Sequence, residues 1–293
     1  MKIPSIIIKE DLDQEVRQFL RGLHHEQFPW LKNLISFTFP ELVQSIKKSP
    51  DREEQLVRSF IIGYRKKHEE KIKQIIKESK LLLDSKSEEA LISLANVMDY
   101  AWPENHPGYI IIPVILPHSP YGENIIYFSL LGSVFGNKKP HDVLFISIHE
   151  ISHMILHTIL KEDHAEQFAS LNFHYLKEIL AAVLMNQKPL KDTLGIKEYF
   201  GNDNLHEIYT LDGDEKVRIS VFFQRLYEKL KYEKKKSFKE ILSEMSQIIV
   251  SIKDELKEKK ELWNKYSRKT LNGTIVPEGY DKPIKLPENQ NAI

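Results

Sequence analysis

Apolar residues recur at helical spacing through the first third of this 293-residue chain. In residues 51–83 they return every three or four positions, as in Leu56, Phe60 and Tyr64, with charged residues between them. This period places the apolar side chains on one face of a helix. A further helix is predicted over about 87–100, ending before the turn-rich sequence WPENHPG.

The pattern changes after residue 107. The runs YIIIPVILP (109–117) and NIIYFSLLG (124–132) are short, rich in Ile and bounded by Pro, Gly or Asn. Such runs are typical of β-strands, so we expect two strands joined by a loop around 119–123. Pro113 indicates that the first strand lies at a sheet edge or is irregular, because proline cannot donate to a neighbouring strand.

Helical spacing returns from residue 140 onward. The predicted helices cover roughly residues 140–160, 164–187, 214–232 and 237–266, and an extended tail follows. The fold class expected from this order is α+β and mostly helical, with a small mixed or antiparallel sheet. We expect a helical N-terminal region over 1–107 and a core with a helical C-terminal region over 108–293, as two domains or as one continuous domain.

Composition removes several classes of function. The chain has no cysteine, which excludes disulfides, thiolate metal sites and thiol nucleophiles. Lys plus Arg and Asp plus Glu both total 42, so no net field favours nucleic acid or an anionic membrane as a partner. The N-terminus lacks the apolar run of a signal peptide, and no run of about eighteen uncharged apolar residues is present. A soluble cytoplasmic protein is therefore expected.

The histidines are clustered, since nine of the twelve lie between His106 and His206. The cluster centres on His149-Glu150-Ile151-Ser152-His153, an HExxH motif inside a predicted helix. Side chains four residues apart lie on one face of a helix about 6 Å apart along its axis, so both imidazoles can bind one zinc ion. The carboxylate of Glu150 would then be placed to accept a proton from water beside that ion.

The histidines of this helix also allow other roles. His149 and His153 can be hydrogen-bonded core residues, but two buried imidazoles without a metal leave several donors and acceptors to satisfy. His157 lies eight residues from His149, about 12 Å along the helix axis, so these two cannot share one tetrahedral ion. His157 is expected to pack against the core or to support the site.

A catalytic zinc ion keeps three protein ligands, so a third donor must come from elsewhere. Four acidic or histidine residues near the end of the motif helix lie too far along its axis: Glu162, Asp163, His164 and Glu166. A second, antiparallel helix would come level with the histidine pair ten to fifteen residues after the turn. Glu178 and His174 fall in that window, and spacing leaves both open.

An HExxH helix followed by a glutamate in the sequence KEILAAVL resembles the gluzincins, the thermolysin-like zinc metallopeptidases. The resemblance covers about 70 residues, Tyr109 to Leu184. The metzincin pattern does not fit, because it requires glycine and histidine where this chain has Leu156 and Ile159. In many gluzincins an aspartate four residues after the ligand glutamate supports the first histidine, but this chain has Ala182 there.

The resemblance implies a site and a reaction. His149 and His153 would bind one Zn²⁺, Glu178 would be the third ligand and Glu150 the general base. Strand 124–132 would offer its edge to an extended peptide or protein substrate. The residue that stabilises the oxyanion would come from one group of aromatic candidates: Tyr199, His206 or Tyr209.

The sequence therefore predicts a zinc-dependent peptidase. Two alternatives stay open. One is a non-catalytic zinc-binding or regulatory interaction protein on a zincin-like fold, and the other is a zinc hydrolase that acts on a non-peptide amide.

Overall fold

The computed structural model describes residues 2–25, 29–131, 141–162, 171–266, 268–270 and 273–286. The chain divides into two compact units, each described by itself below. Unit 1 holds Met1–Leu91 and Trp102–Met154, and unit 2 holds Ile92–Ala101 and Ile155–Ile293. Two long helices belong to both units: α5 (Glu69–Val97) and α7 (His141–Glu162). The expected boundary after residue 107 stays a prediction.

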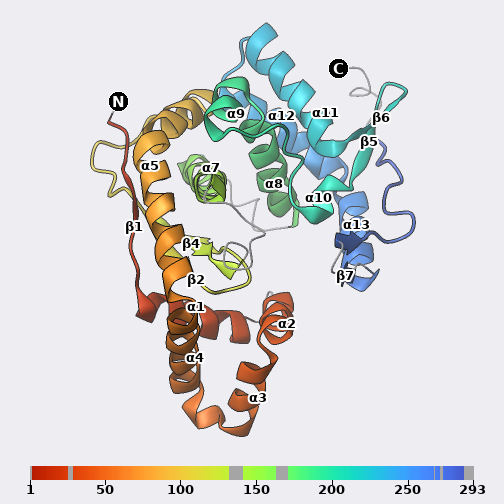
Figure 1. The fold of residues 1–293 in the computed structure, drawn as a ribbon. Helices are drawn as coiled ribbons and strands as arrows, with labels where there is room; N and C mark the ends of the chain where they lie inside the picture. Colours follow the sequence, from red (N-terminus) through yellow and green to blue (C-terminus); the bar gives the residue numbers. More distant parts are fainter. Residues whose placement is uncertain are drawn as a thin grey trace. The chain divides into compact units, whose positions relative to one another are not determined.

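The fold is mostly helical with a small mixed sheet, which confirms the α+β class (Figure 1). The four-stranded sheet of unit 1 has the order β1-β2-β4-β3. Its strands are β1 (Ile6–Ile8), β2 (Tyr109–Val114), β3 (Tyr121–Gly122) and β4 (Ile125–Ser129). The first three in the order run parallel, and β3 is antiparallel to β4. Both predicted strands are therefore present, together with two short ones that the sequence did not indicate.

Pro113 lies inside the sheet, so its assignment to an edge strand was wrong. The amide of Lys9 donates to the carbonyl of Ile111 at 2.9 Å and makes the last bond between β1 and β2. Pro113 lies two residues after Ile111, so its backbone faces the same side of β2. At that point the pairing of β1 with β2 has already ended. No neighbouring strand there requires an amide donor, and the Pro113 carbonyl accepts a bond from Arg65.

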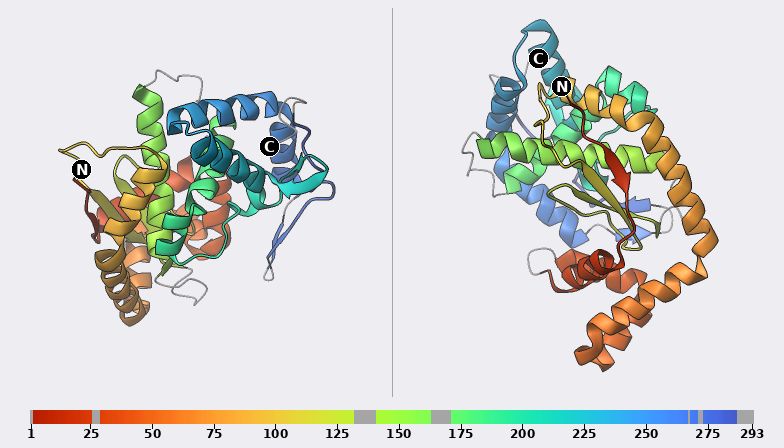
Figure 2. Two further views of the ribbon diagram at one scale, coloured as in Figure 1. Left: turned by 90° about the horizontal axis from the view of Figure 1, so that it is seen from above. Right: turned by 90° about the vertical axis from the view of Figure 1, so that its left-hand side faces the viewer.

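Helices α1 to α4 share one hydrophobic core with the sheet in unit 1 (Figure 2). They are α1 (Leu12–His24), α2 (Pro29–Thr38), α3 (Pro40–Lys48) and α4 (Glu53–Lys67), with a 3₁₀ turn at Pro50–Arg52. Phe19, Ile35 and Ile61 from these helices are fully buried and pack in the same cluster as Ile112 and Val114 of β2. Leu56, Phe60 and Tyr64, which were predicted to share one apolar face, are partly buried and pack against this cluster.

A buried ion pair ties this helical layer to the end of β2. The carboxylate of Glu15 is fully buried, lies 2.8 Å from Nη2 of Arg65 and accepts a 2.6 Å bond from the amide of Ile115. Burial raises the pKa of Glu15, and the charge of Arg65 acts in the opposite direction. The pair connects α1, α4 and the residue that follows β2.

Unit 2 is built around α8 (Leu171–Met185), which is buried on nearly all sides from Tyr175 onward. Within the described residues it contacts five later α-helices: α9 (Lys188–Leu194), α10 (Asp203–His206), α11 (Ile219–Glu228), α12 (Phe238–Ser251) and α13 (Lys253–Tyr266). The start of the predicted helix 164–187 falls at 163–170, outside the described residues.

The other helix predictions in unit 2 need correction. Part of the helix expected over 214–232 is a hairpin, β5 (Tyr209–Asp212) and β6 (Glu215–Arg218), which turns at Gly213 with a φ of 61°. The helix expected over 237–266 is interrupted at Ile252. The tail carries a second short hairpin, β7 (Arg268–Thr270) and β8 (Gly273–Ile275).

Among the residues that the structure describes, one segment is long and apolar enough to cross a membrane, Asp142–Leu160 of α7. It contains two acidic residues and three histidines, and 67% of it is buried within the structure. Such burial is usual for the core helix of a soluble protein. The cytoplasmic location stays a prediction.

Candidate metal centre

Helix α7 carries the HExxH motif in the interior of the protein. Two serine hydroxyls of α7 donate to backbone carbonyls of the same helix. Ser152 donates to the carbonyl of His149 at 2.6 Å, and Ser147 donates to that of Val143 at 2.7 Å. The helical period brings the imidazoles of His149 and His153 together, with their Nε2 atoms 3.0 Å apart and their ring centroids 4.5 Å apart. The pair is therefore set by the helix itself, as the spacing predicted.

Glu178 of α8 joins the two histidines. One ligand atom from each of His149, His153 and Glu178 lies within 4.8 Å of the others. All three residues are shielded from solvent, with exposed fractions of 9%, 1% and 8% for the whole residue in that order. These three residues could hold one metal ion.

The geometry of the histidine pair fits such an ion. Two nitrogens bound to one tetrahedral zinc at about 2.0 to 2.1 Å would lie about 3.3 Å apart, close to the observed separation of 3.0 Å. Two histidines and one carboxylate are also a donor set found in catalytic zinc sites. The identity of the ion is not fixed by these distances, since imidazole and carboxylate also bind other divalent metals.

His174 is the alternative third ligand, and it does not belong to this group of three. It lies one turn before Glu178 on α8, and its ring packs 5.6 Å from that of Tyr175. Burial lowers the pKa of His174 to about 4, although the negative charge of Glu178 acts in the opposite direction. Its imidazole is therefore neutral at pH 7.

Lys177 contacts the glutamate of the group directly. Its Nζ lies 2.7 Å from Oε1 of Glu178, and the two side chains are 17% and 11% exposed. Sequence analysis missed this lysine, because adjacent helical residues normally point in different directions.

Tyr121 is a second residue that sequence analysis missed. It lies in β3, and its ring centroid is 5.7 Å from that of His153 within unit 1. The sequence placed 119–123 in a loop, and two strand residues are too few to produce a recognisable alternation. Strand β3 thus brings an aromatic side chain beside a histidine of the candidate site.

The strand expected to bind a peptide is not at the sheet edge. Strand β4 pairs with β2 on one side and β3 on the other, and the amide of Tyr127 already donates to the carbonyl of Pro120 at 2.8 Å. The edge on that side is β3 instead. The last residue of the predicted strand, Gly132, lies outside the described residues.

The remaining candidates have separate surroundings in unit 2. His157 packs its ring 4.7 Å from that of Phe173, in agreement with a packing role. Tyr199 is held by its backbone to Asn186, and His206 lies 2.8 Å from the carboxylate of Glu207. The ring of Tyr209 lies under the cations of two neighbouring side chains, those of Lys216 and Arg218. An oxyanion role for Tyr199, His206 or Tyr209 stays a prediction.

The four ligand candidates near the end of the motif helix fall outside the described part of the site. Asp163, His164 and Glu166 lie outside the described residues, and the side chain of Glu162 is not described either. The general-base role of Glu150, the residue after His149 on α7, stays a prediction.

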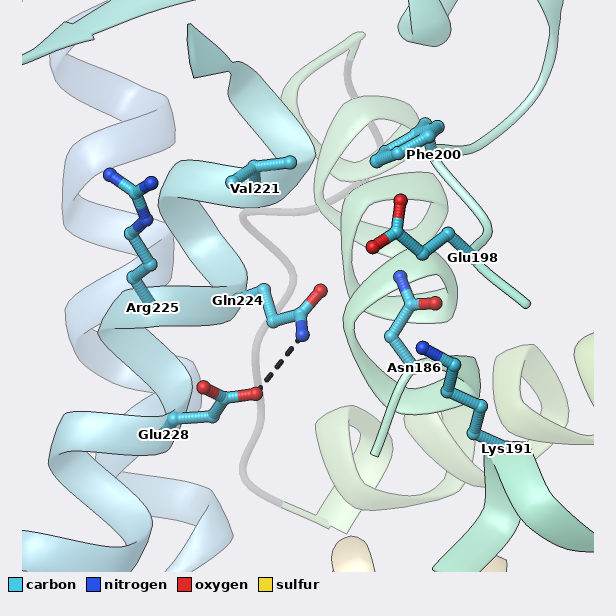
Figure 3. A pocket seen from close by; sticks show the side chains of 8 residues that line it. All are labelled: Asn186, Lys191, Glu198, Phe200, Val221, Gln224, Arg225 and Glu228. Carbon is cyan, nitrogen blue, oxygen red and sulfur yellow. Dashed lines mark hydrogen bonds between the residues drawn. The ribbon is translucent and has the colours of Figure 1, made fainter. Parts of the chain in front are cut away.

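A polar pocket of about 260 Å³ lies elsewhere in unit 2 (Figure 3). Gln224 and Glu228 of α11 face it from one wall and share a 3.0 Å hydrogen bond, while Asn186, Lys191 and Glu198 line the opposite wall. None of the three metal-site residues lines this pocket.

No protein-family model, curated protein or solved structure matches the chain. The likeness to gluzincins therefore rests on the HExxH helix and the glutamate that accompanies it.

Proposed function

We propose that this protein is a zinc-dependent peptidase of the gluzincin type. The observation that carries the proposal is the group formed by His149, His153 and Glu178, in which each residue offers a ligand atom within 4.8 Å of the others. Glu150 follows the first histidine directly, so the group comes with a carboxylate suited to proton transfer.

In this proposal each residue of the site has its own role. His149, His153 and Glu178 would hold the ion and leave one coordination position open. A zinc ion held there supplies Lewis acidity, which polarises a peptide carbonyl and lowers the pKa of water. Glu150 would accept the proton of the attacking water and pass it to the leaving amine.

The substrate class that fits this arrangement is an extended peptide. Strand β3 is a short sheet edge, and an extended chain can add to such an edge through backbone hydrogen bonds. Tyr121 of the same strand lies beside His153, which supports binding of the peptide next to the metal ligands.

One observation favours a different function. The three candidate ligands are at most 9% exposed, so a metal ion held by them would be poorly accessible to a large substrate. The alternative is therefore a non-catalytic metal-binding or regulatory interaction protein on the same fold.

The variant Glu150→Gln separates the two functions. Purified wild-type protein is expected to contain about one zinc ion per chain and to cleave an unstructured protein. The variant should keep the zinc and lose cleavage by at least about 100-fold, because general acid–base catalysis contributes that much or more. Glu41→Gln on α3 is a matched control that should leave both zinc content and cleavage unchanged.

The outcomes are distinct. Zinc without cleavage in the wild type would favour the non-catalytic alternative. Absence of metal from both freshly purified and zinc-reconstituted wild type would exclude the peptidase and would favour an interaction protein that works through the fold itself.

A further inference from the structure

The contact between Lys177 and Glu178 is unusual for its place in the helix. Consecutive residues of an α-helix point about 100° apart around the axis, so their side chains do not normally meet. Here Nζ of Lys177 lies 2.7 Å from Oε1 of Glu178. The lysine side chain therefore bends across the surface of α8 toward its neighbour.

Both side chains are largely withdrawn from solvent. Their exposed fractions, 17% and 11%, separate this pair from ordinary surface ion pairs, in which water and salt weaken the attraction. A partly desolvated ammonium is a strong, oriented donor to a carboxylate. The contact is therefore able to fix the orientation of the glutamate side chain.

The ammonium also distinguishes the two carboxylate oxygens. A metal ion bound to Oε1 would place two cations against one oxygen atom, which is electrostatically unfavourable. An ion held by this group would therefore bind Oε2 instead. Two imidazole nitrogens and one carboxylate oxygen make three protein donors, and they leave the fourth tetrahedral position open.

We propose that Lys177 is a positioning residue that restricts Glu178 to binding the metal through a single oxygen. This inference rests on the metal site proposed above. A carboxylate that bound through both oxygens would fill the position that a catalytic site leaves open, so the lysine would decide whether the site can accept a fourth, exchangeable ligand.

Visible spectra of the cobalt(II)-loaded protein test this inference without reference to activity. Four-coordinate cobalt(II) absorbs visible light severalfold more strongly than five-coordinate cobalt(II). Wild-type protein is expected to show the intense spectrum. Lys177→Met should weaken the spectrum severalfold, because Glu178 can then bind through both oxygens.

Lys260→Met is the matched control. The charge of Lys260 acts near Glu178, since it contributes to the lowered pKa of His174 one turn away. Removal of this lysine therefore tests whether the loss of any nearby positive charge changes the spectrum. The control should keep the wild-type spectrum. Circular dichroism would establish that each variant is folded.

Two results would overturn the inference alone: a weak, five-coordinate spectrum in the wild type, or an equally intense spectrum in Lys177→Met. The wild-type result overturns the inference whether or not Lys177→Met folds. Failure of the wild type to bind cobalt at all would instead remove the metal site, and the inference with it.

Discussion

Glu178 and His174 lie one helical turn apart on α8, and the sequence spacing alone does not choose between them. The structure separates them by side-chain placement, because a carboxylate oxygen of Glu178 reaches the histidine pair and His174 is not part of that group. His174 instead has a neutral, largely buried imidazole beside Tyr175. The two residues should therefore differ sharply when each is removed.

Glu178→Ala is expected to weaken zinc binding by more than about 100-fold, because the loss of a direct ligand exceeds the 10- to 100-fold effect of residues that only support ligands. His174→Ala should weaken it by less than about tenfold. Competition with a chromophoric chelator would give both affinities. A larger loss in His174→Ala than in Glu178→Ala would show that the third ligand has been assigned to the wrong residue.

At the scale of elements, α12 shows how local sequence fixes a helix start. Ser237 accepts a bond from the amide of Glu240 through its hydroxyl, and the Glu240 carboxylate accepts a 2.8 Å bond from the amide of Ser237. This capping box satisfies two amides that the first turn would otherwise leave without partners. The amide of Phe238 donates to Asp99 at 2.7 Å, so the same helix start is also held by a residue far away in the sequence.

Ser237→Ala should lower the free energy of unfolding by about 1 kcal/mol, which is the usual cost of losing such a cap. Ser246 provides the control in the same helix, since its hydroxyl donates to the carbonyl of Leu242 in the helix interior and caps nothing. Ser246→Ala should change the stability by less than about 0.5 kcal/mol. Equal urea midpoints for the wild type and Ser237→Ala would contradict the capping role.

At the scale of the whole molecule, the candidate ligands come from two different helices, α7 and α8. An ion that binds only the folded chain stabilises it by mass action, by about 2.7 kcal/mol at a free concentration 100 times its dissociation constant. Removal of the ion should therefore be visible in the unfolding of the protein as a whole.

A chelator is expected to lower the thermal midpoint of the zinc-loaded wild type by several degrees, and added zinc should restore it. His149→Ala removes one ligand and should make the midpoint insensitive to the chelator. Differential scanning calorimetry provides the measurement. A zinc-loaded wild type whose midpoint does not move with the chelator would show that the ion does not bind the folded state preferentially.

The sequence by itself determined the features that arise within one helix or one continuous run. His149 and His153 meet because the helical period repeats every 3.6 residues, and the strands around Ile111 and Tyr127 follow from their apolar, Ile-rich runs. The existence of α7 and α8 was predicted for the same reason.

Only the tertiary structure decided which distant segments meet. Strand β1 pairs with β2 across about a hundred residues, and nothing local in three apolar residues marks that partner. The same holds for Tyr121 beside His153 and for the choice of Glu178 over His174. Contacts of this kind depend on packing between elements, which the period of a single element does not encode.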